Sequence, residues 1–266
     1  SDPATKAAVI IDPVLDYEPK GAKLGTASAD AILAAAAAAG LEILWVLETH
    51  VHADHLSAGD YIRRQTGAGI AIGARITEVQ KIFAALFEAD DVTPDGSQFD
   101  RLLADGTELP LGDLSIRVLA TPGHTPGCVT YVIGDAAFVG DTMFMPDYGT
   151  ARTDFPGGNA EALYQSIQRI LALPDATRVF VGHDYLPAGR DHFEWESSVA
   201  VQRSSNIHVG GQHSHDEFVA MRQARDATLA PPLLILPSLQ VNIRAGALPP
   251  ASPKGRHFLK LPITRV

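Results

Sequence analysis

Cysteine is nearly absent from this chain of 266 residues, in which Cys128 stands alone. One thiol cannot form an intrachain disulfide bond, so a reducing, cytoplasmic setting is expected, although a cysteine-poor periplasmic protein would have the same composition. The chain also lacks an apolar segment of about 18 residues or more, the length that indicates a membrane span, and no signal peptide is visible in residues 1–266. Because Ser1 is not an initiator Met, the sequence leaves open what precedes it in the natural protein.

Positive charge is scarce as well, with 21 Lys and Arg against 31 Asp and Glu and a formal net charge of −10. Binding to nucleic acid requires a basic surface, so no nucleic acid is expected as a partner. The same acidity disfavours an anionic membrane surface, and no membrane partner is expected. No glycine-rich dinucleotide fingerprint follows a predicted strand, which argues against a nicotinamide or flavin cofactor.

Histidine, by contrast, is concentrated in one segment, residues 50–55, with the sequence His-Val-His-Ala-Asp-His. The segment follows the apolar run at residues 43–47, which predicts a buried strand. A strand that ends in this pattern presents three imidazoles and a carboxylate at one sheet edge. Neutral imidazole and carboxylate are ligands for zinc or iron(II). The pattern therefore predicts a metal site built from His50, His52, Asp54 and His55.

Three other short apolar runs are followed by a single metal-ligating residue each, namely His124, Asp141 and His183. Five of the ten histidines thus occur at predicted strand ends. Loops at one edge of a sheet are where binding sites are usually built. We therefore expect these three residues to belong to the same metal site as the motif at residues 50–55.

The order of predicted elements indicates a mixed α/β sandwich rather than a regularly alternating parallel sheet. Strands are predicted at residues 8–12, 43–47, 114–120, 129–133, 136–139 and 179–181, and helices at 28–39, 57–65, 159–173 and 214–227. Asn159 is the expected amino-terminal cap of the third helix, and a capping box from Ser214 to Glu217 opens the fourth. We expect a catalytic domain over residues 1–204 and a carboxyl-terminal extension over 205–266, packed on the same domain.

The full set of motifs closely resembles that of the metallo-β-lactamase superfamily, over most of residues 8–190. The resemblance implies an αββα sandwich, two mixed β-sheets flanked by helices. In dinuclear members the matching positions would place His50, His52, His124 and Asp141 on one metal, and Asp54, His55, Asp141 and His183 on the other.

Within the superfamily, the sequence is most similar to the persulfide dioxygenase branch, which is related to glyoxalase II. The local matches are residues 11–15, 49–55, 121–130, 152–155, 183–185 and 241–244. This resemblance implies one Fe(II) per chain, held by His50, His124 and Asp141. It places His52, Asp54, His55 and His183 around that iron or at a second-metal position.

The implied reaction is oxidation of glutathione persulfide by O₂ to sulfite and glutathione. Candidate substrate contacts are Arg152, Tyr185, Asn242 and Arg244, although Arg152 could instead pair with Asp184. Because every dinuclear ligand is retained, a glyoxalase II-like hydrolase of a glutathione thioester, with one or two zinc ions, remains an alternative. A non-catalytic metal-binding module is a second alternative, and a homodimer is expected from the superfamily resemblance.

Overall fold

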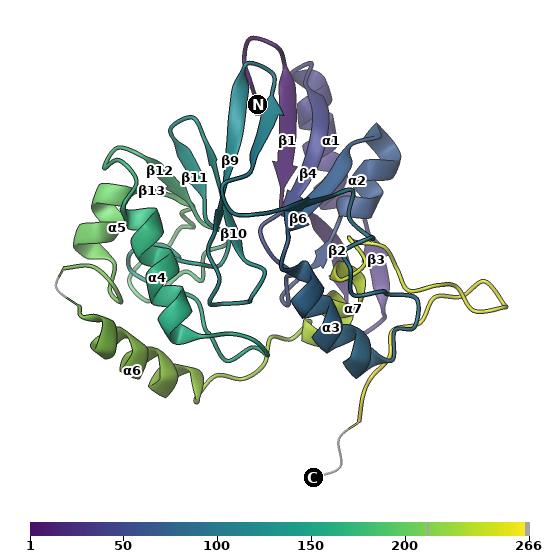
Figure 1. Cartoon of the computed structure of the whole chain (residues 1–266). Coiled ribbons are helices and arrows are strands. Elements are labelled where there is room, and N and C mark those ends of the chain that lie inside the picture. The colour runs from purple at the N-terminus through teal and green to yellow at the C-terminus, as the bar shows by residue number, and fades with distance from the viewer. Residues whose placement is uncertain (212, 264–266) are drawn as a thin grey trace. The chain divides into compact units, whose positions relative to one another are not determined.

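A computed structural model describes residues 1–211 and 213–263 (Figure 1). The strands are β1 (Ala7–Ile11), β2 (Val14–Glu18), β3 (Lys23–Gly25), β4 (Glu42–Glu48), β5 (Leu56–Ser57), β6 (Gly69–Gly73), β7 (Arg101–Leu103), β8 (Glu108–Leu111), β9 (Leu114–Ala120), β10 (Val129–Ile133), β11 (Ala136–Phe138), β12 (Arg178–Phe180) and β13 (Glu196–Ser198). The helices are α1 (Ala27–Ala38), α2 (Gly59–Thr66), α3 (Ile76–Phe87), α4 (Ala160–Leu171), α5 (Val199–Ser205), α6 (His215–Asp226) and α7 (Ile235–Asn242). None of these helices is both long enough and apolar enough to cross a membrane, for the residues the structure describes.

The chain divides into two compact units, which are interleaved in the sequence. Unit 1 comprises residues 1–103, 111–113 and 231 to the carboxyl end, and unit 2 comprises residues 104–110 and 114–230. The predicted boundary at residue 204 falls inside α5 and remains a prediction. The carboxyl-terminal region is shared, because α6 belongs to unit 2 and α7 belongs to unit 1.

Unit 1 is organised by a four-stranded parallel sheet in the order β1-β4-β6-β7. Parallel strands are usually covered on both faces, which explains the continuous apolar character of β4 and of β6. The predicted strand at residues 43–47 is confirmed as β4. A small sheet in the order β3-β2-β5 lies in the same unit. Its strand β5 begins directly after His55 and pairs with β2, so the metal motif leads straight into this sheet.

Two helices of unit 1 are absent from the sequence-based prediction. Helix α3 buries Val79, Phe83 and Phe87 along one face, the spacing expected of an amphipathic helix. Helix α7 is short and carries Pro237 in its first turn, a composition that resembles a loop in the sequence alone. Tertiary packing stabilises α7, because Leu239 and Val241 lie in the core of unit 1.

Unit 2 is organised by a six-stranded mixed sheet in the order β13-β12-β11-β10-β9-β8. Strands β11 and β12 are parallel, whereas the pairs β9–β10, β10–β11 and β12–β13 are antiparallel. The predicted strands at residues 114–120 and 129–133 are confirmed.

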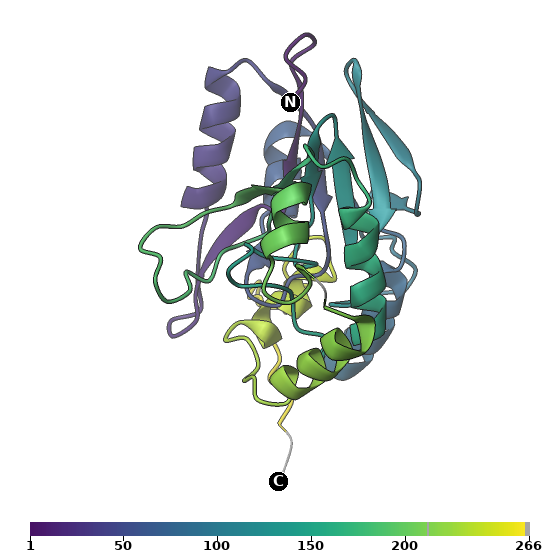
Figure 2. The same ribbon diagram turned by 90° about the vertical axis from the view of Figure 1, so that its left-hand side faces the viewer.

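Local capping signals account for the helices of unit 2 that the sequence predicts. The Asn159 side chain accepts a hydrogen bond from Ala162 N at 2.8 Å and begins α4, and the Ser214–Glu217 capping box begins α6. Figure 1 and Figure 2 both show α4 beside α6, and Phe218 of α6 joins Leu163 and Ile167 of α4 in the core of unit 2.

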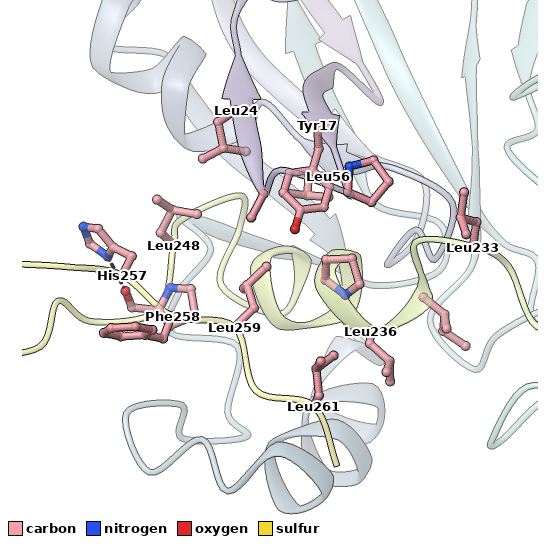
Figure 3. Close-up of a pocket in the computed structure, with 15 residues that line it drawn as sticks. Tyr17, Leu24, Leu56, Leu233, Leu236, Leu248, His257, Phe258, Leu259 and Leu261 are labelled. Atoms are coloured by element: carbon pink, nitrogen blue, oxygen red, sulfur yellow. Dashed lines mark hydrogen bonds between the residues drawn. The ribbon is translucent and has the colours of Figure 1, made fainter. Parts of the chain in front are cut away.

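An apolar groove of about 660 Å³ lies in unit 1, between β2 and β3 and the carboxyl-terminal segment (Figure 3). Its lining includes Tyr17, Leu24, Leu236, Leu248, Phe258 and Leu261. His257 is the one metal-ligating residue type among the lining residues. The groove is therefore not the predicted metal site, which lies in the loop between β4 and β5.

Candidate metal centre

The loop between β4 and β5 in unit 1 carries the His-x-His-x-Asp-His motif. The ring centroids of His50 and His52 are 4.0 Å apart, and those of His52 and His55 are 4.2 Å apart. One ligand atom each from His52, Asp54 and His55 lies within 4.8 Å of the others. His50 and His52 are buried, with exposed fractions of 2% each. Unit 1 therefore gathers the four side chains of the motif, as the sequence predicts.

Thr49 orients His50 through a contact that the sequence analysis did not identify. Its hydroxyl donates to Asp12 Oδ2 at 2.7 Å, and the same oxygen lies 3.0 Å from His50 Nδ1. Since the hydroxyl proton is directed to Asp12, the oxygen accepts the proton of His50 Nδ1. The lone pair of this imidazole is then on Nε2, the tautomer required for a metal ligand bound through that atom.

In the sequence, Asp12 stands at the end of the first predicted strand and within the local match at residues 11–15, and no place in the metal site is predicted for it. It adopts a left-handed backbone conformation (φ 49°) and accepts a 2.7 Å hydrogen bond from Thr49 N. Because β1 and β4 run parallel, with Ile11 paired to Leu47, their carboxyl ends meet at one edge. That pairing is what brings Asp12 to the metal motif.

Asp12 and Glu48 also surround His52 with negative charge. His52 Nε2 lies 3.0 Å from Asp12 Oδ1 and 3.6 Å from Glu48 Oε2. Burial by itself lowers the pKa of His52, but the charge of Asp12 and its hydrogen bond, together with Asp54 and Glu48, outweigh burial and raise this pKa to about 10. Burial, reinforced by the charge of Asp12, raises the pKa of Glu48 to about 7. Without a metal, His52 is therefore an imidazolium paired with Asp12 at neutral pH.

His55 has the opposite character. Burial, followed by the positive charge of His52, lowers its pKa, so the ring is neutral. Its Nε2 is buried and has no hydrogen-bond partner within residues 1–211 and 213–263, while Nδ1 lies 3.3 Å from Asp54 Oδ2. A neutral imidazole with such a nitrogen costs free energy unless a ligand is bound to it. The residues of unit 1 thus fit a metal ion.

Unit 2 brings His124, Asp141 and His183 together. Asp141 follows β11 and His183 follows β12, and because these strands are parallel, both residues occur at the same sheet edge. Asp141 Oδ2 lies 3.2 Å from His183 Nε2 and 3.9 Å from His124 Nε2. A Cβ atom at Gly182 would lie 2.8 Å from Asp141 Oδ1, so a side chain there would displace the Asp141 carboxylate. Two imidazole nitrogens thus lie within 4 Å of one carboxylate oxygen, a donor set that also fits a metal ion.

A main-chain group fixes the orientation of His124. Its Nδ1 lies 2.8 Å from the carbonyl oxygen of Arg152. A carbonyl only accepts hydrogen bonds, so Nδ1 carries the proton and Nε2 presents its lone pair on the side of Asp141. Gly123, with φ of 143°, allows α4 to approach, because a Cβ atom there would lie 2.3 Å from Leu163 Cα.

The four predicted substrate contacts occur in two different settings, beginning with Arg152 and Tyr185 in unit 2. Arg152 forms a bidentate pair with Asp154 (Nε–Oδ1 and Nη2–Oδ2, both 2.6 Å), so pairing with Asp184 is wrong; Asp184 pairs with Arg190. Tyr185 is half exposed and its hydroxyl lies 3.3 Å from His183 Nε2. Substrate contact by Arg152 and Tyr185 remains a prediction.

Asn242 and Arg244, in unit 1, are buried and engaged with the protein itself. Asn242 bonds the main chain of the metal motif, and Arg244 forms a bidentate pair with Asp91 (Nε–Oδ2 and Nη2–Oδ1, both 2.7 Å). Their predicted role in substrate binding likewise remains a prediction.

Comparison with known proteins places these residues in a family. The model of the "Metallo-beta-lactamase superfamily" matches residues 4–183. The chain belongs to this superfamily. The predicted membership and fold class are confirmed, an α/β fold with mixed sheets flanked by helices.

Similar proteins have both hydrolase and dioxygenase names. A "Probable metallo-hydrolase" of Burkholderia pseudomallei is 52% identical and covers 100% of this chain and 94% of its own length. A "Beta-lactamase hydrolase-like protein" of Agrobacterium fabrum is 54% identical over 99% of this chain, which spans 61% of that longer protein. The human "Persulfide dioxygenase ETHE1, mitochondrial" is 31% identical, with 94% of this chain and 84% of the human protein covered. The crystal structure of "ETHE1 from Myxococcus xanthus" superposes with a TM-score of 0.73 at 33% identity, covering 93% of this chain and 92% of that one.

Proposed function

We propose that the protein is a non-haem Fe(II) persulfide dioxygenase that oxidises glutathione persulfide with O₂. The observation that carries the proposal is the similarity to the human persulfide dioxygenase, which extends over 94% of this chain. The fold-level match to ETHE1 of Myxococcus xanthus over 93% of the chain supports the same choice. The Fe(II) ion, one per chain, is proposed to bind His50, His124 and Asp141.

The electron balance of this reaction requires no further cofactor. The outer sulfur of the persulfide loses four electrons, which reduce one O₂, and water supplies the third oxygen of sulfite. Glutathione is released as the thiol. When bound, the iron would supply a redox-active centre with open positions for sulfur and oxygen.

The protein's own residues would orient the ligands and bind the substrate. The Thr49 hydroxyl and the Arg152 carbonyl hold the proton on Nδ1 of His50 and of His124, respectively. This leaves Nε2 of each ring with the lone pair that would bind the metal. The remaining ligand-type residues, His52, Asp54, His55 and His183, would surround that iron. Tyr185, whose hydroxyl lies near His183, is the substrate contact that the geometry of unit 2 supports best.

A zinc-dependent hydrolase of a glutathione thioester is a second candidate, and two observations favour it. The Burkholderia relative, named a metallo-hydrolase, is 52% identical. In addition, His52, Asp54 and His55 gather ligand atoms within 4.8 Å, and the buried Nε2 of His55 has no hydrogen-bond partner among the described residues, which suits a second metal. One or two zinc ions would then generate a hydroxide nucleophile.

Metal analysis combined with two assays separates these functions. Iron and zinc are quantified in the purified protein, and O₂ uptake with glutathione persulfide is compared with hydrolysis of a glutathione thioester. One iron per chain with O₂ uptake and sulfite production is expected. Thioester cleavage by a zinc-loaded protein without O₂ uptake would establish the hydrolase instead. Metal binding with neither activity would indicate a non-catalytic module. Light scattering on the same sample would test the homodimer expected from the superfamily resemblance.

A further inference from the structure

The carboxyl-terminal region contributes helix α7 to unit 1 and helix α6 to unit 2. Side chains of each helix form hydrogen bonds to a segment that carries or orients candidate metal ligands of the same unit. Helix α7 contacts the loop at residues 52–57 in unit 1. Helix α6 contacts the segment at residues 150–153 in unit 2. Neither interaction follows from a sequence pattern, since the partners are 72 to 190 residues apart.

In unit 1 the side chain of Asn242 bonds the main chain of the metal motif and of Ser57, two residues after it. Its Nδ2 donates to the carbonyl oxygens of His52 at 2.9 Å and His55 at 2.8 Å, and its Oδ1 accepts from Ser57 N at 2.7 Å. Asn242 is buried, with an exposed fraction of 4%. One amide therefore fixes the main chain at both ends of the His52–His55 segment.

Helix α7 is itself firmly held within unit 1. Gln80 Nε2 donates to Ile243 O at 3.0 Å, and the Arg244–Asp91 pair lies one residue further along. Leu239 and Val241 are buried in the core. Asn242 therefore presents its amide from a rigid element, and loss of that amide would release the loop rather than the helix.

In unit 2 the corresponding residue is Asp226. Its Oδ2 accepts from Thr153 N at 2.8 Å and from Thr153 Oγ1 at 2.9 Å. Its Oδ1 accepts from Arg222 Nε at 2.9 Å, and Arg222 Nη1 donates to Thr150 O at 3.1 Å. Arg222 and Asp226 are buried, with exposed fractions of 1% and 5%. Arg152 lies in the chain between Thr150 and Thr153, and its carbonyl oxygen accepts a hydrogen bond from His124 Nδ1.

We propose that Asn242 and Asp226 are positioning residues for metal binding, one for each unit. Asn242 holds the loop of His52 and His55, and Asp226 holds the carbonyl that orients His124. The proposal rests on the metal site of the proposed function and not on the reaction performed there. Partners that orient metal ligands typically contribute about 10- to 100-fold to metal affinity.

The test uses matched substitutions in the full chain. Asn242→Asp replaces the donating amide, and Gln240→Glu makes the same change on the same helix, where Gln240 bonds Leu236 and Lys260 and not the motif. Asp226→Asn is matched with Glu217→Gln, which alters the capping box of α6. Thr153→Val is a milder second variant in unit 2, because it removes one hydrogen bond to Asp226 and leaves the Arg222–Asp226 pair intact.

The readouts are the dissociation constant of Co(II), from chelator competition, its absorption spectrum, and the thermal midpoint of the metal-free protein. We expect about 10- to 100-fold weaker Co(II) binding and an altered spectrum for Asn242→Asp and Asp226→Asn. Gln240→Glu and Glu217→Gln should lose thermal stability but bind Co(II) like the parent.

If Asn242→Asp and Asp226→Asn bind Co(II) like their matched controls, the positioning role is overturned, whatever the enzymatic activity. If Asp226→Asn does not fold, an unchanged Co(II) affinity in Thr153→Val overturns the role in unit 2. A parent protein that binds Co(II) but fails to oxidise persulfide would overturn the proposed function alone and leave the positioning role supported.

Discussion

The two units solve the same problem, the orientation of an imidazole toward a metal, by different means. In unit 1 side chains orient His50, through the Thr49 hydroxyl and the Asp12 carboxylate. In unit 2 the main-chain carbonyl of Arg152 orients His124. Side-chain orientation depends on pH and on residue identity, whereas a carbonyl has no ionisable group. The ligand support of unit 1 should therefore be the more sensitive to substitution and to pH.

The two units also differ in where their buried charged side chains act. In unit 1 the buried His52 contacts the partly buried Asp12 and the buried Glu48, and the pKa of His52 and the pKa of Glu48 are both raised. Buried ion pairs are costly to form and more costly to break. In unit 2 the buried Arg222–Asp226 pair bonds the main chain, because Asp226 accepts from Thr153 N and Arg222 donates to Thr150 O.

The largest effect is expected from removal of one ligand in either unit. His50→Ala and Asp141→Asn should each reduce activity to background, because both residues are proposed ligands of the Fe(II). Metal content and O₂ uptake with glutathione persulfide measure this effect. His192→Ala, which alters an exposed histidine paired with Asp191, is the control and should retain full activity. Retention of metal in only one of the two ligand variants would show that the units bind separate metals.

The second prediction concerns pH and the metal-free protein. The pKa of His52 is about 10 in the folded state and about 6.5 when unfolded, so its stabilising effect is complete below pH 6.5 and is lost as pH rises through 10. The free energy of unfolding should fall across this window by up to about 1.4 kcal/mol per pH unit.

Urea denaturation of metal-free parent and His52→Asn proteins, from pH 6 to 10, measures this slope. The variant lacks the titrating group and should show a flatter profile. Equal slopes for the two proteins would contradict the pairing of His52 with Asp12.

The third prediction concerns the close approach of Gly182 to Asp141 in unit 2. Gly182→Ala places a methyl group 2.8 Å from Asp141 Oδ1, and overpacking of this kind costs about 1–3 kcal/mol. Urea denaturation and metal content are the measurements, and metal content should fall with stability. Gly25→Ala, where the nearest atom is Asp16 Cβ at 3.4 Å, should change stability little. A Gly182→Ala protein as stable as the parent would refute the need for glycine there.

The smallest effect is expected from substitutions at Thr49 and Arg152, which carry the groups that orient His50 and His124. Thr49→Val removes the hydroxyl that accepts from His50, and metal affinity should fall about 10-fold, while Thr49→Ser should restore it. Arg152→Ala leaves the carbonyl in place, so metal affinity should be unchanged even if substrate binding weakens. Competition with a chelator measures both. A larger loss for Arg152→Ala than for Thr49→Val would reverse the comparison.

Local sequence signals predicted the elements whose determinants lie within a few residues. The apolar run of β4, the Asn159 cap of α4 and the capping box of α6 are such signals, and each is confirmed. Helix α7 was missed because it is short, contains Pro237 and is stabilised by buried contacts with distant residues. Helix α7 is therefore determined by the packed core of unit 1 and not by a local signal.

The sequence by itself determined the metal-ligand types, their place at strand ends and, through the motif at residues 50–55 and the glycine-flanked His124, the superfamily. Such information is local, because a strand end and its ligand are adjacent in the chain. Only the tertiary structure decided which groups orient those ligands. Asp12 reaches Thr49 through parallel strand pairing, while Asn242 and Asp226 reach their loops across 185 and 73 residues. Hydrogen bonds of this range leave no periodic trace in a sequence, since packing alone brings their partners together.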